Sequence, residues 1–144
     1  MANATMAAFG YPDTLIKEYA HWCVLLRPAQ ATLGALVLVC KDEADAFPKI
    51  SSGAFAEMAR VTAEIEAALN GFRPFQRINY LMLMMVDRDV HFHVLPRYEQ
   101  TQSYAGIAFA DSGWPKLPDL SRAVTLSPDK RDQLVAELRG IWPA

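Results

Sequence analysis

The sequence predicts an α+β fold: a mainly antiparallel sheet of about five strands, with one long helix and a C-terminal helix. Three observations support this prediction. Two apolar runs lie near the N-terminus, one amphipathic stripe lies mid-chain, and two further apolar runs flank a short polar break. Short apolar runs bounded by Pro, Gly or charged residues are typical of strands, whereas apolar residues at every third or fourth position are typical of a helix.

Four of the predicted strands follow directly from these runs. Residues 21–27 and 34–40 are apolar and are bounded by proline, glycine or charged residues, so each predicts a buried strand. Residues 77–86 and 89–98 are separated by Asp87-Arg88, and this arrangement predicts a hairpin.

Both predicted helices carry clear start signals. The serine pair at 51–52 can cap the first, whose apolar side chains recur at helical spacing as far as Leu69, before a stop at Asn70-Gly71. Ser127 followed by Pro128 opens the C-terminal helix, with serine as the N-cap and proline in the first turn.

The length of 144 residues predicts one domain over residues 1–144. Residues 1 to about 11 are expected to form a flexible tail. Residues 99–144 are expected to form a C-terminal extension packed on the domain, irregular until its helix begins.

Composition and charge narrow the class of protein. The net charge of −2 gives no large basic field, so a nucleic acid polymer is not an expected partner. No apolar run reaches the ~18–20 residues of a membrane span, and the N-terminal residues lack the basic region of a secretory signal. Cys23 and Cys40 each lie in an apolar run, which predicts buried thiols in a cytoplasmic protein.

The residues best suited to chemistry lie in the last predicted strand. Side chains alternate faces along a strand, so His91 and His93 share one face with Asp89, while Val90, Phe92 and Val94 share the other. Two imidazoles in this arrangement suit either a metal pair or a nucleophile and its helper at a phosphate.

The surrounding residues resemble a known signature. Residues 89–97, Asp-Val-His-Phe-His-Val-Leu-Pro-Arg, are similar to the motif of the histidine-triad (HIT) superfamily, in which three histidines alternate with apolar residues before an aliphatic-Pro-Arg stretch. Ile-Asn-Tyr at 78–80 is similar to the strand that leads into the motif. The resemblance covers about residues 21–98 and is closest to bacterial HIT-like proteins of the diadenosine tetraphosphate hydrolase type.

The resemblance implies roles for individual residues. His91 stands at the nucleophile's position and His93 at the third histidine's, while Asp89 replaces the first histidine. Ala35 stands where many members of the family have another histidine. Asp89 would either repel an anionic substrate or orient His91, as carboxylates do in hydrolase triads.

Two further residues are candidate nucleotide-binding groups. Arg97 could bind phosphate through its planar fork, and Asn79 could contact the ligand from the neighbouring strand. The alternative roles are a surface ion pair for Arg97 and backbone contacts within the hairpin for Asn79.

Three functions remain open. The first is a HIT-type nucleotide hydrolase or nucleotidyl transferase that forms a covalent nucleotidyl-histidine at His91, on a dinucleoside polyphosphate or a nucleoside phosphoramidate. It needs no cofactor and no metal, and the resemblance implies a homodimer. The second is a catalytically weak or inactive nucleotide-binding protein, and the third is a metal site at Asp89, His91 and His93.

Overall fold

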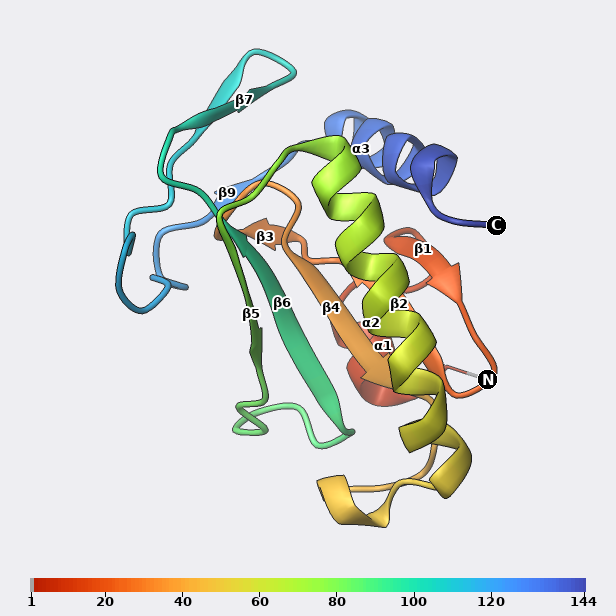
Figure 1. Cartoon of the computed structure of the whole chain (residues 1–144). Coiled ribbons are helices and arrows are strands. Elements are labelled where there is room, and N and C mark those ends of the chain that lie inside the picture. The colour runs from red at the N-terminus through yellow and green to blue at the C-terminus, as the bar shows by residue number, and fades with distance from the viewer. Residues whose placement is uncertain (1) are drawn as a thin grey trace.

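A five-stranded antiparallel sheet lies at the centre of the molecule, in the computed structural model that describes residues 2–144 (Figure 1). The strand order is β1-β2-β4-β6-β5. The strands are β1 (Leu15–Glu18), β2 (Trp22–Leu26), β4 (Leu36–Cys40), β6 (His91–Arg97) and β5 (Arg77–Leu81). The predicted α+β class, with its long helix and C-terminal helix, is confirmed.

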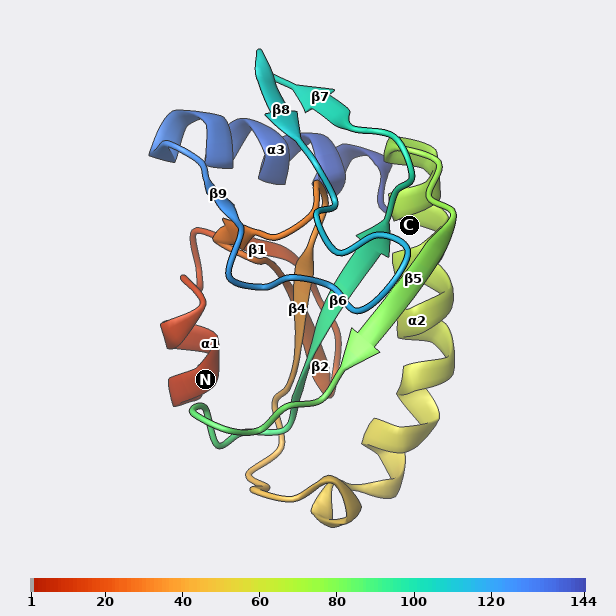
Figure 2. The same cartoon turned by 90° about the vertical axis from the view of Figure 1, so that its left-hand side faces the viewer.

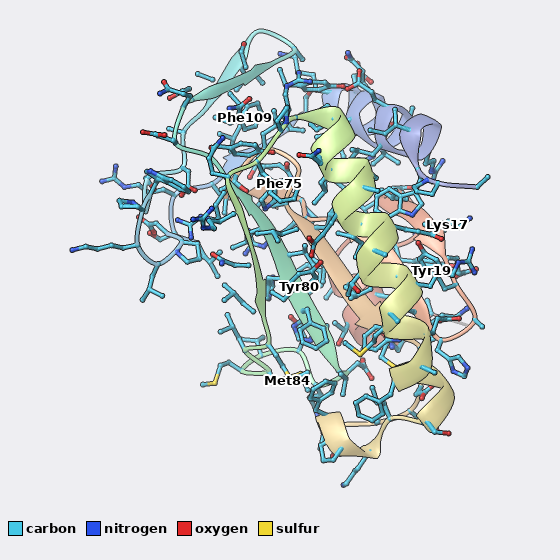
Figure 3. All side chains as sticks on the ribbon, in the orientation of Figure 1. Lys17, Tyr19, Phe75, Tyr80, Met84 and Phe109 are labelled. Carbon is cyan, nitrogen blue, oxygen red and sulfur yellow. The ribbon has the colours of Figure 1, made fainter. Side chains whose placement is uncertain are left out.

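The long helix, α2 (Ser52–Phe72), covers one face of the sheet. The Ser51 hydroxyl caps it by accepting a hydrogen bond from the Ala54 amide. Tyr80 of β5 points towards this helix, and its hydroxyl lies 2.8 Å from Glu66 Oε2 (Figure 3). The buried side chains of α2 share one stripe of the helix: Ala54, Val61, Ile65, Ala68, Leu69 and Phe72.

β2 and β4 are apolar throughout because they are covered on both faces. Val24 and Leu38 belong to the main core with α2, whereas Cys23, Leu25 and Val39 belong to a second cluster on the opposite face. That opposite face is covered in part by α1 (Ala4–Ala8), so the sheet lies between α1 and α2 (Figure 2).

The N-terminal residues form a packed helix where the sequence predicted a tail. The Asn3 side chain caps α1 by accepting a hydrogen bond from the Met6 amide. Met6 is 1% exposed and packs on the second cluster. A helix of one turn and a half is too short to be recognised from periodicity, and long-range packing stabilises it.

The hairpin prediction was wrong in its extent. β5 ends at Leu81, and a loop follows until His91 opens β6. Met84 has a φ of 53°, in the left-handed region that strands do not use. Leu83, Met85 and Val86 are 48%, 85% and 87% exposed, so these three side chains lie outside the core, whereas Met82 and Met84 pack against it.

The remaining elements lie around the sheet. The helix α3 (Pro128–Ile141) packs beside α2 and β1 and begins at Pro128, as predicted. Two small sheets, β3 (Ala29–Gln30) with β9 (Val124–Thr125) and β7 (Gln102–Tyr104) with β8 (Ile107–Phe109), complete the chain with the 3-10 turn η1 (Phe47–Lys49). None of the helices within residues 2–144 combines the length and the apolar character needed to cross a membrane.

Candidate active site

His91 and His93 lie side by side on the sheet face that α1 partly covers. Their strand is interior to the sheet, and in the β4–β6 register His91 is opposite Val39 and His93 is opposite Val37. The two side chains are 2% and 7% exposed, and their ring centroids are 5.3 Å apart. The predicted pairing of the two imidazoles on one face is therefore present, at a buried and rigid position.

A backbone contact orients His91. Its Nδ1 lies 2.7 Å from the backbone oxygen of Asp89. A carbonyl oxygen can only accept a hydrogen bond, so Nδ1 carries the proton. In the neutral ring the lone pair is then on Nε2, which is the arrangement that a nucleophilic histidine needs.

His93 has the opposite arrangement. Arg27 Nε lies 3.3 Å from His93 Nδ1, and a guanidinium can only donate, so Nδ1 accepts and the proton is on Nε2. Burial, assisted by the charge of Arg27 and by His91, lowers the pKa of His93 to about 4. His93 is thus a neutral hydrogen-bond donor at its Nε2, beside a histidine whose neutral ring has its lone pair at Nε2.

This lowered pKa predicts acid-sensitive stability. An unfolded His93 binds a proton near pH 6.5, whereas the folded protein binds it only near pH 4. The unfolded state therefore holds more protons between these values, and the free energy of unfolding should decrease as the pH is lowered through this window. Thermal unfolding of wild type and His93→Asn between pH 4 and 7 tests this, because the variant should lose part of the slope. Equal slopes would contradict it.

Both histidines line a small pocket of about 200 Å³. The Phe9 ring, just after α1, covers them, with centroid distances of 5.9 Å to His91 and 5.6 Å to His93. Small-molecule sites commonly measure ~300–1,000 Å³, so the pocket in this form takes a group rather than a whole nucleotide. Its walls are Phe9, Arg27, Leu83, Met84, Met85, Val86, Asp87, His91 and His93.

Asp89 has a different position from the one its alternation with the histidines suggested. It precedes β6, and its carboxylate accepts hydrogen bonds from the amide of Thr5 at 3.1 Å and from the Thr5 hydroxyl at 2.9 Å. The group that orients His91 is the backbone carbonyl of Asp89, while its carboxylate holds α1. A catalytic role for the Asp89 carboxylate stays a prediction.

The contacts of Asp89 with Thr5 predict the behaviour of α1. Replacing Asp89 by Ala removes both acceptor contacts, so amide hydrogen exchange of residues 4–9 should become faster, by roughly 10-fold for a loss of ~1–1.5 kcal/mol. Asp45→Ala is a matched control, since Asp45 forms an exposed ion pair with Lys49. Unchanged exchange in Asp89→Ala would show that other contacts hold α1.

Asn79 and Arg97 lie together, in a second cavity on the β5–β6 side of the sheet. Arg97 is 4% exposed and binds Asp111 through Nε at 2.6 Å and Nη2 at 3.0 Å, while Nη1 donates to Asn79 Oδ1 at 2.7 Å. Nη2 also donates to the Lys116 carbonyl, so one of the five N–H groups of Arg97 has no partner among the described residues. These partners are all protein groups, so a contact of Asn79 or Arg97 with a nucleotide stays a prediction.

A metal site has little support from the geometry. Across residues 2–144, no group of three His, Cys, Asp or Glu side chains is placed to hold a metal ion. The two histidines provide two ligands, and the Asp89 carboxylate is engaged by Thr5. The donor set of a structural or catalytic zinc site, at least three protein ligands, is not assembled by the described residues.

Sequence reasoning missed the two side chains that contact the imidazole rings of His91 and His93. Arg27 follows β2 directly and Phe9 follows α1, and both reach the histidines from more than 60 positions away in the chain. A charged residue at the end of an otherwise apolar strand was the available signal for Arg27. No comparable signal was present for Phe9.

Solved structures of the same architecture are histidine-triad proteins. A histidine triad protein from Bradyrhizobium japonicum has a TM-score of 0.68 and 14% identity, with 99% of this chain and 98% of that chain covered. A histidine triad (HIT) protein from Sinorhizobium meliloti has a TM-score of 0.68 and 16% identity, with coverage of 96% and 93%. A hypothetical histidine triad nucleotide-binding protein from Sulfolobus tokodaii has a TM-score of 0.66 and 14% identity, with coverage of 89% and 82%.

Sequence comparisons give no further assignment, since no protein-family model and no curated protein matches the chain. The structural likenesses extend over nearly the whole chain at identities of 14–16%, which is evidence about the fold. Together with the five-stranded sheet and its two flanking helices, they show that this chain has the histidine-triad fold.

Proposed function

We propose that this protein is a nucleotide hydrolase or nucleotidyl transferase of the histidine-triad type, and that it forms a covalent nucleotidyl-histidine at His91. The complementary tautomers of the two histidines in one pocket support this proposal most directly. His91 offers a lone pair at its Nε2, whereas His93 offers an N–H group at its own Nε2. A nucleophile beside a fixed donor suits attack on a phosphoryl group, whose oxygens accept hydrogen bonds as charge develops.

The proposed reaction has two steps. In the first, the Nε2 lone pair of His91 attacks the α-phosphorus of a dinucleoside polyphosphate or a nucleoside phosphoramidate, and the leaving group departs with the electron pair of its bond to phosphorus. In the second, the oxygen of a water molecule attacks the same phosphorus while the bond from phosphorus to Nε2 breaks, which releases a nucleoside monophosphate and returns the lone pair to Nε2. The water loses a proton to solvent, and the leaving group of the first step takes up a proton from solvent. His93 donates its N–H to a non-bridging oxygen in both steps.

Capture of the covalent intermediate tests this function. The protein is mixed with a panel of dinucleoside polyphosphates and nucleoside phosphoramidates, quenched rapidly, and analysed by intact mass. We expect an adduct with the mass of a nucleoside monophosphate less one water, mapped to His91 by peptide sequencing. Product formation without any adduct, or an adduct on another residue, would refute the nucleotidyl-histidine at His91.

A second candidate is a nucleotide-binding protein with little or no activity. The cover that Phe9 places over both imidazoles favours it, as do Ala35 and Asp89 at positions where the resembling family has histidines. Tight nucleotide binding with no product after prolonged incubation would favour this candidate over the enzyme.

We also propose a cytoplasmic homodimer. Cys23 and Cys40 are buried free thiols, as expected in a reducing compartment.

β5 is an edge strand, and the loop after it exposes the apolar side chains of Met85 and Val86. If a partner covers this loop, Met85→Asp should lower the dimer fraction measured by sedimentation velocity. A wild type that sediments as a monomer would contradict the dimer.

A further inference from the structure

Arg27 has an unusual electrostatic position in the histidine pocket. Its side chain lines the wall beside His91 and His93, and its guanidinium is partly buried. No carboxylate oxygen within residues 2–144 lies within 4.0 Å of that guanidinium. Arg97, which is buried on β6, is neutralised by Asp111. Arg27 is thus a cation at a partly buried site with no carboxylate of the described residues within 4.0 Å.

The hydrogen bonds of Arg27 leave most of its donors available. Nε donates to His93 Nδ1 at 3.3 Å, and Nη1 donates to the Ala29 carbonyl. A guanidinium has five N–H groups, so three have no partner among the described residues. Burial of this uncompensated charge is unfavourable, and it lowers the pKa of Arg27. An anion in the pocket would offset that cost.

The contacts of Arg27 with His93 and with the Ala29 carbonyl also determine which N–H groups are left to bind a ligand. Nε holds the Nδ1 side of His93, which leaves the His93 Nε2–H as a donor in the same pocket as the free N–H groups of Arg27. Asp87 also lines the pocket, with its carboxylate more than 4.0 Å from the Arg27 guanidinium, so without Arg27 the lining residues would carry a negative fixed charge. The volume of about 200 Å³ is suited to a group of phosphate size.

We propose that Arg27 is the anion-binding residue of this pocket, and that Arg27 and His93 together hold a tetrahedral oxyanion of the phosphate class beside Nε2 of His91. The fork of a guanidinium matches two oxygens of such an ion. This proposal rests on the proposed function in one respect: the oxyanion is taken to be the reacting phosphoryl group of a nucleotide. Arg27 is then both a phosphate ligand and the residue that sets the tautomer of His93.

Binding of inorganic phosphate and of adenosine monophosphate, measured by calorimetry and by the imidazole resonances of His91 and His93, tests the proposal. Arg27→Met should weaken binding of both probes by on the order of 10- to 100-fold, since a charge-assisted hydrogen bond is lost. Arg27→Lys should restore part of that affinity as a point charge. Arg122→Met is the matched control, because Arg122 is an exposed cation that lines neither the histidine pocket nor the cavity of Asn79 and Arg97, and we expect this variant to bind both probes as wild type does.

Several outcomes would overturn the proposal. Wild type that binds neither probe at millimolar concentration would do so, as would Arg27→Met with wild-type affinity. Equal loss in Arg122→Met would show a general charge effect. Circular dichroism verifies folding, and Arg27→Lys supplies the comparison if Arg27→Met is unstable. Transfer of the His93 proton to Nδ1 in Arg27→Met, read from its nitrogen shifts, is expected from the tautomer argument.

The two proposals fail in different ways. If wild type binds phosphate through Arg27 but releases no nucleoside monophosphate from any substrate, the anion site stands and the enzyme proposal fails. If wild type is active and Arg27→Met keeps its KM and kcat, the enzyme proposal stands and Arg27 is not the ligand. When both hold, Arg27→Met should raise KM at least 10-fold and also lower kcat, because the developing charge on the phosphoryl oxygens is less stabilised.

Discussion

His91→Ala is expected to reduce nucleotide turnover by at least ~1,000-fold while leaving the fold intact. Covalent catalysis depends on the Nε2 lone pair, and no other side chain in the pocket offers an equivalent nucleophile with a fixed tautomer. Loss of a nucleophile commonly costs several orders of magnitude in kcat. Steady-state release of nucleoside monophosphate, with circular dichroism to verify folding, measures the effect.

His21, the histidine of this chain that lies outside the pocket, provides a matched control. His21 lies next to α2, with Nδ1 3.4 Å from Asp42 Oδ1, and takes no part in the pocket that contains His91. His21→Ala should therefore keep wild-type turnover. Wild-type turnover in His91→Ala would remove His91 from the nucleophile's role, and equal losses in both variants would point to destabilisation rather than to chemistry.

Much of the fold could be predicted because its elements have strong local signals. Residues 21–27 and 34–40 are apolar runs that became β2 and β4, and Ser51 caps the long helix as its side-chain chemistry suggested. β1 was not predicted, since it has four residues with a partly exposed pattern. The end of β5 at Leu81 was also unpredictable, because Met84 and its neighbours are as apolar as a strand would be.

The candidate site was predicted only in the part that is local in sequence. His91 and His93 share a face by the alternation of a strand, which the sequence shows directly. The partners that fix their protons are a backbone carbonyl and a distant arginine, Arg27. Phe9 reaches them through the packing of α1 on the sheet. Such contacts depend on tertiary structure, and single-sequence periodicity carries no information about them.

Arg97→Met is expected to cause the largest loss of stability among single substitutions at the candidate residues. The Arg97–Asp111 pair is almost fully buried, with side chains 5% and 1% exposed. Removing one partner leaves Asp111 as an uncompensated buried charge, which typically costs ~3–5 kcal/mol. For a chain of this size that is about a 6–20 °C decrease in Tm. Thermal unfolding monitored by circular dichroism measures it.

The surrounding contacts allow the structural role of Arg97 to be separated from its predicted role in nucleotide binding. Arg122→Met breaks an exposed pair with Asp119 and should change the free energy of unfolding by less than ~1 kcal/mol. Arg97→Met with Asp111→Leu removes both charges, so it should regain part of the lost stability. If Arg97→Met instead kept the wild-type Tm, the pair with Asp111 would contribute little to folding. If the same variant also lost nucleotide affinity, Arg97 would be a ligand contact.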